Sequence, residues 1–204
     1  MIRTWLGDVT SLLEEEQYRA YYHTVPAYRK EKADKLRFQK DRALSIGAWV
    51  LFERMRKAYN LSSEVSFNLS HSGTFVLCSV EDSGDCSVKV GCDLEQVKRE
   101  ERLDVARRFF CGEEYKSILE NKVSFYRCWV LKESFMKATR LGMKLGMNEF
   151  EIGFGTGVPV LKSKPEKIEG QFYFKEYEWG ELPYRIAVCA SRDDFAEALQ
   201  VIKL

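Results

Sequence analysis

The stretch VGCDLEQV, residues 90–97, starts as an apolar β-strand and then places two acids at alternate positions. Alternate residues of a strand point to the same face, so Asp93 and Glu95 share one face. Their backbone positions would lie about 6.6 Å apart, at a rise of about 3.3 Å per residue. Two like charges held side by side repel each other and cost stability. The pattern therefore indicates a site at which a cation relieves the repulsion.

The composition excludes several classes of protein. The chain has 204 residues with a net charge of +1, unlike the strongly basic profile of a general nucleic-acid binder. No apolar run approaches the roughly 18 residues of a membrane span, and the N-terminal stretch MIRTWLGDVTSLLEEEQ shows no signal peptide. Six cysteines without a C-x-x-C pair predict reduced thiols. We therefore expect a cytoplasmic protein that binds neither nucleic acid nor membrane.

Helical and strand patterns alternate on both sides of the opening stretch. A helical pattern with a period near 3.6 covers residues 29–60, after Pro26. Strands are expected at 65–72, 74–81, 87–95, 157–163, 170–180 and 184–191, and further helices at 102–110 and 125–141. Helices followed by strands, twice, predict fold class α+β. We expect two similar halves, residues 1–98 and 99–204, joined by the charged stretch KREE at 98–101.

A second informative stretch is CWVLKESFMKA, residues 128–138. Trp129, Glu133 and Lys137 are four residues apart and lie along one stripe of a helix. One interpretation is a surface ion pair between Glu133 and Lys137, with Trp129 anchored in the core. The other is that Glu133 enters a cleft as a third carboxylate, with Lys132 and Lys137 contacting phosphate oxygens.

Both stretches together favour the second interpretation. Asp93, Glu95 and Glu133 would supply three hard oxygen ligands of the kind that Mg²⁺ prefers. Neighbouring lysines suit an anionic substrate that bridges to the metal.

These stretches resemble the signature motifs of the surfactin-type 4′-phosphopantetheinyl transferases. Gly91, Asp93 and Glu95 match a Gly-x-Asp-x-Glu motif, and Trp129 to Lys137 match a later Trp-x-x-Lys-Glu-x-x-x-Lys motif. FNLSHSG, residues 67–73, is similar to the family's Asn-x-Ser-His-Ser strand, and RKEKADK, residues 29–35, to its basic helix. RRFFCGEEY, residues 107–115, resembles the segment between the two signatures. The similarity spans roughly residues 27–155.

The resemblance implies a fold and an activity. It implies that the chain folds into two halves related by pseudo-twofold symmetry and that the protein is active as a monomer. The implied reaction moves the phosphopantetheine arm of coenzyme A onto a serine of an acyl or peptidyl carrier protein and releases adenosine 3′,5′-bisphosphate. The implied cofactor is Mg²⁺, with coenzyme A as co-substrate.

The resemblance also implies roles for individual residues. Asp93, Glu95 and Glu133 match the metal ligands, and Lys132 and Lys137 match lysines beside the pyrophosphate. Glu114 matches a glutamate proposed as general base, although its neighbour Glu113 is an alternative match. The positions that match coenzyme A contacts are Arg29, Lys32, Ser45, Ser70 and His71.

Several alternatives stay open. Arg29 to Lys35 also fits a solvated helix face, because Glu31 and Asp34 interleave. The stretch YNLSSEVSF, residues 59–67, lacks a Gly-Lys-Pro segment that family members often carry. Other possible activities are a metal-dependent phosphohydrolase and an inactive module that binds carrier proteins.

One further stretch, VKREERLDVARRFF at residues 97–110, suggests a surface for an acidic carrier protein. It combines basic and apolar side chains, namely Lys98, Arg99, Arg102, Arg107, Arg108, Leu103, Phe109 and Phe110. The alternative is a plain amphipathic helix with a solvated basic face.

Overall fold

The computed structural model describes residues 1–98, 102–155, 157–180 and 183–204. The helices and strands within them are β1 (Ile2–Asp8), η1 (Thr10–Leu13), α1 (Glu15–Thr24), α2 (Ala27–Asp34), α3 (Gln39–Ala58), β2 (Phe67–Ser72), β3 (Phe75–Glu81), β4 (Val90–Gln96), α4 (Leu103–Phe109), α5 (Gly112–Leu119), α6 (Phe125–Ala138), η2 (Gly142–Lys144), η3 (Met147–Glu149), β5 (Glu151–Gly153), β6 (Val160–Ser163), β7 (Tyr173–Tyr177), β8 (Tyr184–Ala190) and β9 (Gln200–Lys203). This mixture of helices and strands confirms the predicted α+β class.

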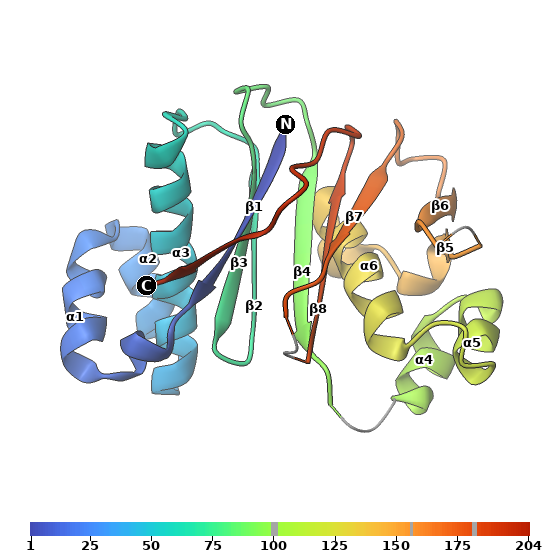
Figure 1. The fold of residues 1–204 in the computed structure, drawn as a ribbon, viewed down its shortest axis with the longest axis horizontal. Coiled ribbons are helices and arrows are strands. Elements are labelled where there is room, and N and C mark those ends of the chain that lie inside the picture. The colour runs from blue at the N-terminus through green and yellow to red at the C-terminus, as the bar shows by residue number, and fades with distance from the viewer. Residues whose placement is uncertain (99–101, 156, 181–182) are drawn as a thin grey trace.

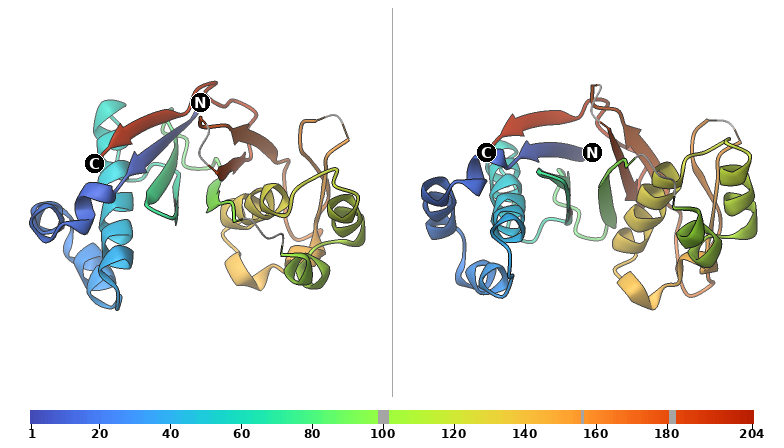
Figure 2. Two further views of the ribbon diagram at one scale, coloured as in Figure 1. Left: turned by 60° about the horizontal axis from the view of Figure 1, so that its bottom comes forward. Right: turned by 90° about the horizontal axis from the view of Figure 1, so that it is seen from below.

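The strands form two main sheets, flanked by helices on their outer sides (Figure 1). The first sheet has the order β2-β3-β1-β9 and the second has the order β4-β8-β7, while β5 pairs with β6. Helix α3 covers the first sheet and α6 covers the second, an arrangement that the turned views also show (Figure 2). The molecule is therefore layered as helix, sheet, sheet and helix.

Each boundary between layers holds an apolar core. The alternation along β3 shows how one strand serves two of them: Val76 and Cys78 face α3, whereas Leu77 faces the second sheet. All seven residues of β3 are buried as a result. The third core packs α6 against β8, with α5 and residues 145–174 around it.

The predicted division into residues 1–98 and 99–204 stays a prediction, as does the pseudo-twofold symmetry. Strand β4 precedes the predicted boundary but pairs with β8 in the second sheet. Strand β9 lies beyond the boundary but pairs with β1 in the first sheet, with Gln200 opposite Trp5. Each sheet is thus completed by a strand from the other side of residue 98.

The prediction of one helix over residues 29–60 is wrong, because the segment forms two helices, α2 and α3. The guanidinium of Arg42 donates hydrogen bonds to the carbonyls of Leu36, at 2.8 Å, and Arg37, at 3.4 Å. Carbonyls at the break are thus satisfied without a continuous helix. The apolar periodicity of the sequence continues through the break, so it does not reveal that the helix is interrupted there.

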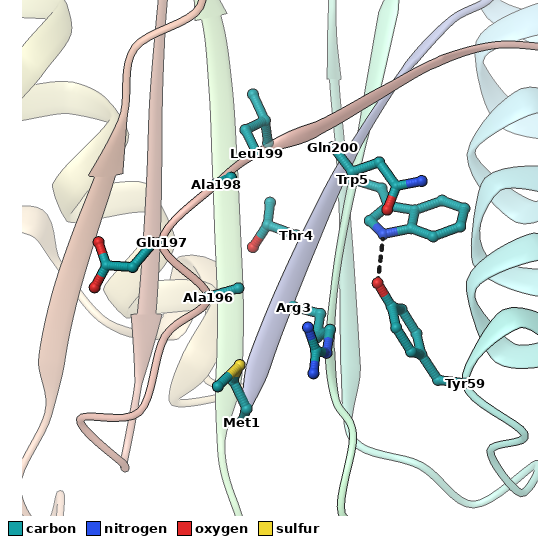
Figure 3. Close-up of a pocket in the computed structure, with 10 residues that line it drawn as sticks. All are labelled: Met1, Arg3, Thr4, Trp5, Tyr59, Ala196, Glu197, Ala198, Leu199 and Gln200. Carbon is teal, nitrogen blue, oxygen red and sulfur yellow. Dashed lines mark hydrogen bonds between the residues drawn. The ribbon is translucent and has the colours of Figure 1, made fainter.

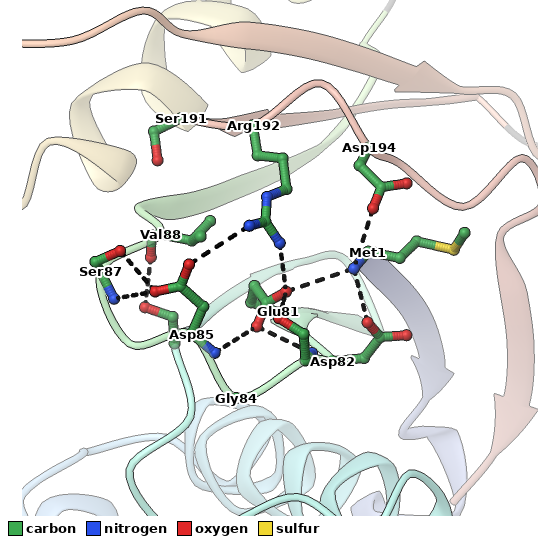
Figure 4. Close-up of polar contacts among 12 residues, drawn as sticks. Met1, Glu81, Asp82, Gly84, Asp85, Ser87, Val88, Ser191, Arg192 and Asp194 are labelled. Carbon is green, nitrogen blue, oxygen red and sulfur yellow. Dashed lines mark hydrogen bonds and ion pairs between the residues drawn. The ribbon is translucent and has the colours of Figure 1, made fainter.

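A polar cluster joins the loop between β3 and β4 to the chain that follows β8 (Figure 4). The buried carboxylate of Glu81 accepts hydrogen bonds from Arg192 at 3.2 Å, Ser83 at 2.7 Å and the backbone of Asp85 at 2.9 Å. Burial alone would raise the pKa of Glu81, but the hydrogen bonds from Ser83 and the backbone of Asp85, together with the charge of the Met1 amino group, lower it. The cluster ties the two sheets together at one end of the molecule.

The six cysteines are free thiols, four of them buried. Among the helices of the described ranges, none combines the length and apolar character needed to cross a membrane.

Candidate active site

The candidate site lies where β4 is covered by α6 and adjoined by β2. Gly91 permits this close approach, since a Cβ atom there would lie 2.1 Å from the carbonyl oxygen of Ser134 and 2.3 Å from the backbone nitrogen of Ala138. Val90, Cys92 and Leu94 point into the core between the sheets. Asp93 and Glu95 point to the opposite face, on which α6 packs.

Asp93 is the centre of the polar contacts at this site. Its side chain is buried, and Oδ1 accepts hydrogen bonds from Lys137 Nζ at 2.6 Å and Ser70 Oγ at 2.8 Å. Lys137 and Ser70 are themselves 3.0 Å apart. The other oxygen, Oδ2, is buried without a hydrogen-bond partner. Burial alone would lower the pKa of Lys137, but the charge and hydrogen bond of Asp93, together with Cys92 and Glu133, outweigh burial and raise it.

Glu95 and Glu133 complete a cluster of carboxylates. Burial, and secondly the charge of Asp93, raises the pKa of both glutamates. Lys137 opposes the shift at each of them, and Ser72 donates a hydrogen bond to Glu95 at 2.9 Å. Asp93 and Lys137 thus form an ion pair, and Glu95 and Glu133 lie within electrostatic range of both. The binding of a metal by the three carboxylates stays a prediction.

The donor set of this cluster suits a hard divalent cation. Asp93 Oδ2 is an unpartnered buried oxygen, and the two glutamates carry charges that their surroundings disfavour. As the side chains stand, the described residues contain no ready-made group of three His, Cys, Asp or Glu ligands around one point. Lys137, which already pairs with Asp93, partly fulfils the cation's electrostatic role.

The predicted coenzyme A contacts lie on the first-sheet side of the site. Part of His71 on β2 is exposed to solvent, yet desolvation of its ring, followed by the charge of Lys137, lowers its pKa. Lys32 contributes in the same direction, whereas Asp41 opposes it. His71 is therefore within electrostatic range of both Lys137 and Lys32.

The remaining predicted contacts are less directly connected to the carboxylates. Arg29 stacks on the Trp49 ring, with its guanidinium carbon 4.1 Å from the ring centroid, and its Nε is buried without a partner. Ser45 is half-buried on α3. Ser70 is 7% exposed and already bonded to Asp93 and Lys137, so its hydroxyl is engaged within the protein.

Glu114 and Lys132 lie in a different place from the three carboxylates. Lys132 Nζ is 2.6 and 2.7 Å from the two Glu114 oxygens and 2.9 Å from the carbonyl of Phe150. The Glu114 carboxylate also accepts the backbone N–H groups of Cys111, at 2.9 Å, and Ile152, at 2.8 Å. Both side chains are buried, at 1% and 0% exposure.

The structure therefore does not bring these two predicted catalytic residues to the carboxylate cluster. Lys132 and Glu133 are consecutive on α6 and so project about 100° apart. Glu113, the alternative to Glu114, is exposed on α5.

Three features of the site were not predicted from the sequence. Ser72 contacts Glu95, Asp41 contributes to the field at His71, and Arg140 donates to the carbonyl of Phe67 at 2.6 Å. Only Ser72 had a signal in the sequence, because it follows Asn68 and Ser70 at the two-residue spacing of a strand face.

A separate cavity of about 460 Å³ lies between β1 and residues 196–200 (Figure 3). Within it, the Trp5 indole donates a hydrogen bond to the Tyr59 hydroxyl at 3.1 Å. None of the predicted site residues lines this cavity.

We call the line along which α6 and β2 meet β4 the seam. Carboxylates close to a lysine at such a place suit a metal ion and a phosphorylated substrate. The model of the 4′-phosphopantetheinyl transferase superfamily matches residues 89–189, which include the carboxylates and α6.

Individual relatives extend the similarity. The chain is 33% identical over 144 residues to 4′-phosphopantetheinyl transferase Sfp of Bacillus subtilis strain 168, covering 68% of this chain and 61% of that relative. It is 29% identical over 198 residues to a 4′-phosphopantetheinyl transferase of Bacillus subtilis, covering 92% and 85%. It is 34% identical over 141 residues to 4′-phosphopantetheinyl transferase ffp of Bacillus subtilis, covering 67% and 59%. The chain thus spans about three fifths of two of these relatives.

The chain belongs to the 4′-phosphopantetheinyl transferase superfamily, and the family predicted from its motifs is confirmed.

Proposed function

We propose that this protein transfers the 4′-phosphopantetheine arm of coenzyme A to a serine of an apo acyl or peptidyl carrier protein, in a Mg²⁺-dependent reaction. Adenosine 3′,5′-bisphosphate is the second product. The observation that carries the proposal is the convergence of Asp93, Glu95 and Glu133 beside Lys137 in a member of this family. The relatives named above as 4′-phosphopantetheinyl transferases support the same reaction.

Asp93, Glu95 and Glu133 would hold the Mg²⁺, which when bound supplies charge neutralisation on the pyrophosphate. Lys137 places a positive charge at the same seam and keeps its proton, because Asp93 raises its pKa. As an ammonium group it stabilises negative charge that develops on the leaving oxygens.

Lys32 and His71 are the best-placed contacts for the phosphates of coenzyme A. Lys32 lies on α2 and His71 on β2, and the charges of Lys137 and Lys32 both lower the pKa of His71. Arg29 presents a guanidinium that is already ordered by stacking on Trp49, which reduces the entropy lost when it binds a phosphate.

The proposed carrier surface is narrower than the predicted stretch. Arg102, Arg107 and Arg108 are exposed beside Leu103 and Phe109, which are each 40% exposed. Phe110, by contrast, is 5% exposed and stacks on Phe125, so it does not belong to this surface. Lys98 is exposed just before the helix, and Arg99 lies outside the described residues.

We further infer that the protein acts as a monomer in the cytoplasm. Support for the monomer comes from the site itself, since one chain contributes all the carboxylates and Lys137. Sedimentation velocity in the presence of coenzyme A and Mg²⁺ tests the oligomeric state.

One experiment separates the proposed reaction from its alternatives. The protein is incubated with coenzyme A, Mg²⁺ and an apo-carrier, and both carrier mass and free nucleotide are measured. A carrier that gains the mass of phosphopantetheine supports the transferase. Nucleotide release without carrier modification would identify a phosphohydrolase. Carrier binding with neither product would identify an inactive binding module.

A further inference from the structure

One face of the β2 region carries polar side chains at every second position toward β4. Ser66 Oγ donates to the carbonyl of Val88 at 2.6 Å, and Asn68 Oδ1 accepts the backbone N–H of Cys92 at 3.0 Å. Ser70 and Ser72 continue this series. We call these four contacts the side-chain ladder, made by Ser66, Asn68, Ser70 and Ser72.

The side-chain ladder joins the edges of two different sheets. Strand β2 is an edge of the first sheet, where it pairs with β3, and β4 is an edge of the second sheet, where it pairs with β8. The partners on β4 follow in the same chain direction as the residues on β2, so the two strands run parallel. Side-chain hydrogen bonds thus connect β2 to β4, whereas backbone hydrogen bonds connect the strands within each sheet.

The contacts of the ladder are of two kinds. Ser66 ends on the backbone of Val88, just before β4, and Asn68 ends on the backbone of Cys92 in β4. Ser70 ends on the carboxylate of Asp93 at 2.8 Å, and Ser72 on that of Glu95 at 2.9 Å. The second pair therefore fixes both carboxylates of the opening stretch relative to the first sheet.

Ser72 is held in register by a second bond. Its Oγ accepts the backbone N–H of Gln96 at 3.0 Å while its proton is donated to Glu95. A hydroxyl has one proton to donate, so its donor capacity is spent on Glu95. This geometry favours orientation of the carboxylate over contact with a substrate phosphate.

We propose that Ser72 is a positioning residue, which orients the Glu95 carboxylate for cation binding, and that Ser70 does the same for Asp93. This inference rests on the proposed function, since it assumes that the carboxylates bind a cation. Groups that orient metal ligands commonly affect metal affinity by about 10–100-fold when they are removed.

The test compares Ser72→Thr with Ser72→Val, because these side chains have the same shape and differ in the hydroxyl. Both are β-branched and suit a strand. Ser66→Ala is the matched control, since it removes a contact of the ladder that ends on a backbone carbonyl. Mn²⁺ affinity is measured by electron paramagnetic resonance without coenzyme A, alongside Mg²⁺-dependent transfer and the melting temperature.

We expect Ser72→Thr to bind Mn²⁺ like the wild type and Ser72→Val to bind it about 10-fold or more weakly. In Ser72→Val the Mg²⁺ concentration needed for half-maximal transfer should rise, while the KM for coenzyme A at saturating Mg²⁺ stays the same. Ser66→Ala should lower the melting temperature without changing Mn²⁺ affinity.

Equal Mn²⁺ affinity in Ser72→Thr and Ser72→Val would overturn the positioning role. So would an equal loss of affinity in Ser66→Ala, because it would show that the ladder acts through general stability. A wild-type protein that neither binds Mn²⁺ nor modifies the carrier would instead refute the proposed function on which the inference rests.

Discussion

At the scale of single residues, His71 offers a direct probe of coenzyme A binding. Burial and neighbouring lysines lower its pKa, so the folded protein holds the imidazole neutral more readily than the unfolded chain does. Its contribution to stability is full above the unfolded pKa of about 6.5 and is lost as the pH falls through that value toward the lower folded pKa. A phosphate placed beside the ring would reverse the shift by favouring the charged form.

We therefore expect saturating coenzyme A to raise the pKa of His71 in an NMR titration. The chain has only two histidines, so His23→Gln leaves a single imidazole signal to follow. A His71 pKa that stays the same in saturating coenzyme A would remove His71 from the phosphate site.

A second prediction at this scale concerns Asp93, which has an unpartnered oxygen and a lysine partner. Mg²⁺ should stabilise the wild-type protein, by about 2.7 kcal/mol at a concentration 100 times the dissociation constant. Asp93→Asn should lose most of this gain in a melting experiment. Because Lys137 also loses its ion pair, the variant should be no more stable than wild type without metal. Asp104→Asn, an exposed acid on α4, is the control and should keep the full Mg²⁺ effect.

At the scale of secondary structure elements, Gly91 sets the distance between β4 and α6. A methyl group at this position would meet backbone atoms of α6, which have no freedom to move away as a side chain would. Gly91→Ala should cost about 1–3 kcal/mol in the free energy of unfolding, or more. Transfer should also fall, because Glu133 and Lys137 would be displaced from Asp93.

Gly112→Ala provides the comparison, because the added methyl group at the start of α5 meets open space. Denaturant unfolding should show no loss of stability for this variant. A Gly91→Ala protein as stable and active as Gly112→Ala would mean that α6 does not depend on this contact.

Glu114 could act in one of two ways: as the general base of transfer, or as a structural clamp, meaning a buried ion pair with Lys132 that holds α5, α6 and β5 together. Each single variant, Glu114→Gln or Lys132→Met, leaves a buried charge unpaired and should cost about 3–5 kcal/mol. The double variant removes both charges and should be less destabilised than the sum of the two.

Transfer kinetics of the folded double variant decide between the two roles. A clamp predicts a kcat close to that of the wild type, whereas loss of a general base predicts a fall of about 10²–10⁴-fold. The contacts of Glu114 with Lys132, Cys111 and Ile152 favour the clamp.

Periodicity along single elements was enough to predict which of these charged side chains share a face. Asp93 and Glu95 share a strand face, and Glu133 and Lys137 share a helix stripe, so their grouping needs only the packing of α6 on β4. The partners of Ser70 and Glu114 depend on neighbours far away in the sequence, which no local pattern encodes. The same limit applies to the break between α2 and α3, where the side chain of Arg42 satisfies the carbonyls.

At the scale of the whole molecule, the exposed basic face of α4 should determine recognition of the carrier. Arg102→Glu should raise the KM for the carrier and leave the KM for coenzyme A unchanged, because steering by surface charge acts on the acidic partner. Lys57→Glu makes the same charge change on α3, on the other side of the molecule, and serves as the control. Equal carrier KM values for the two variants would support a merely solvated basic face.

The pairing of β1 with β9 also has a consequence for the order in which the protein folds during synthesis. Strand β1 can pair with β3 as soon as the first 81 residues are available, as their antiparallel register requires nothing later in the chain. Its other edge must wait for Gln200, so it stays uncovered while the second sheet is being made on the ribosome. An open strand edge in a nascent chain invites pairing with other chains. Closure of the first sheet by β9 is thus a late event that protects the newly made protein from aggregation.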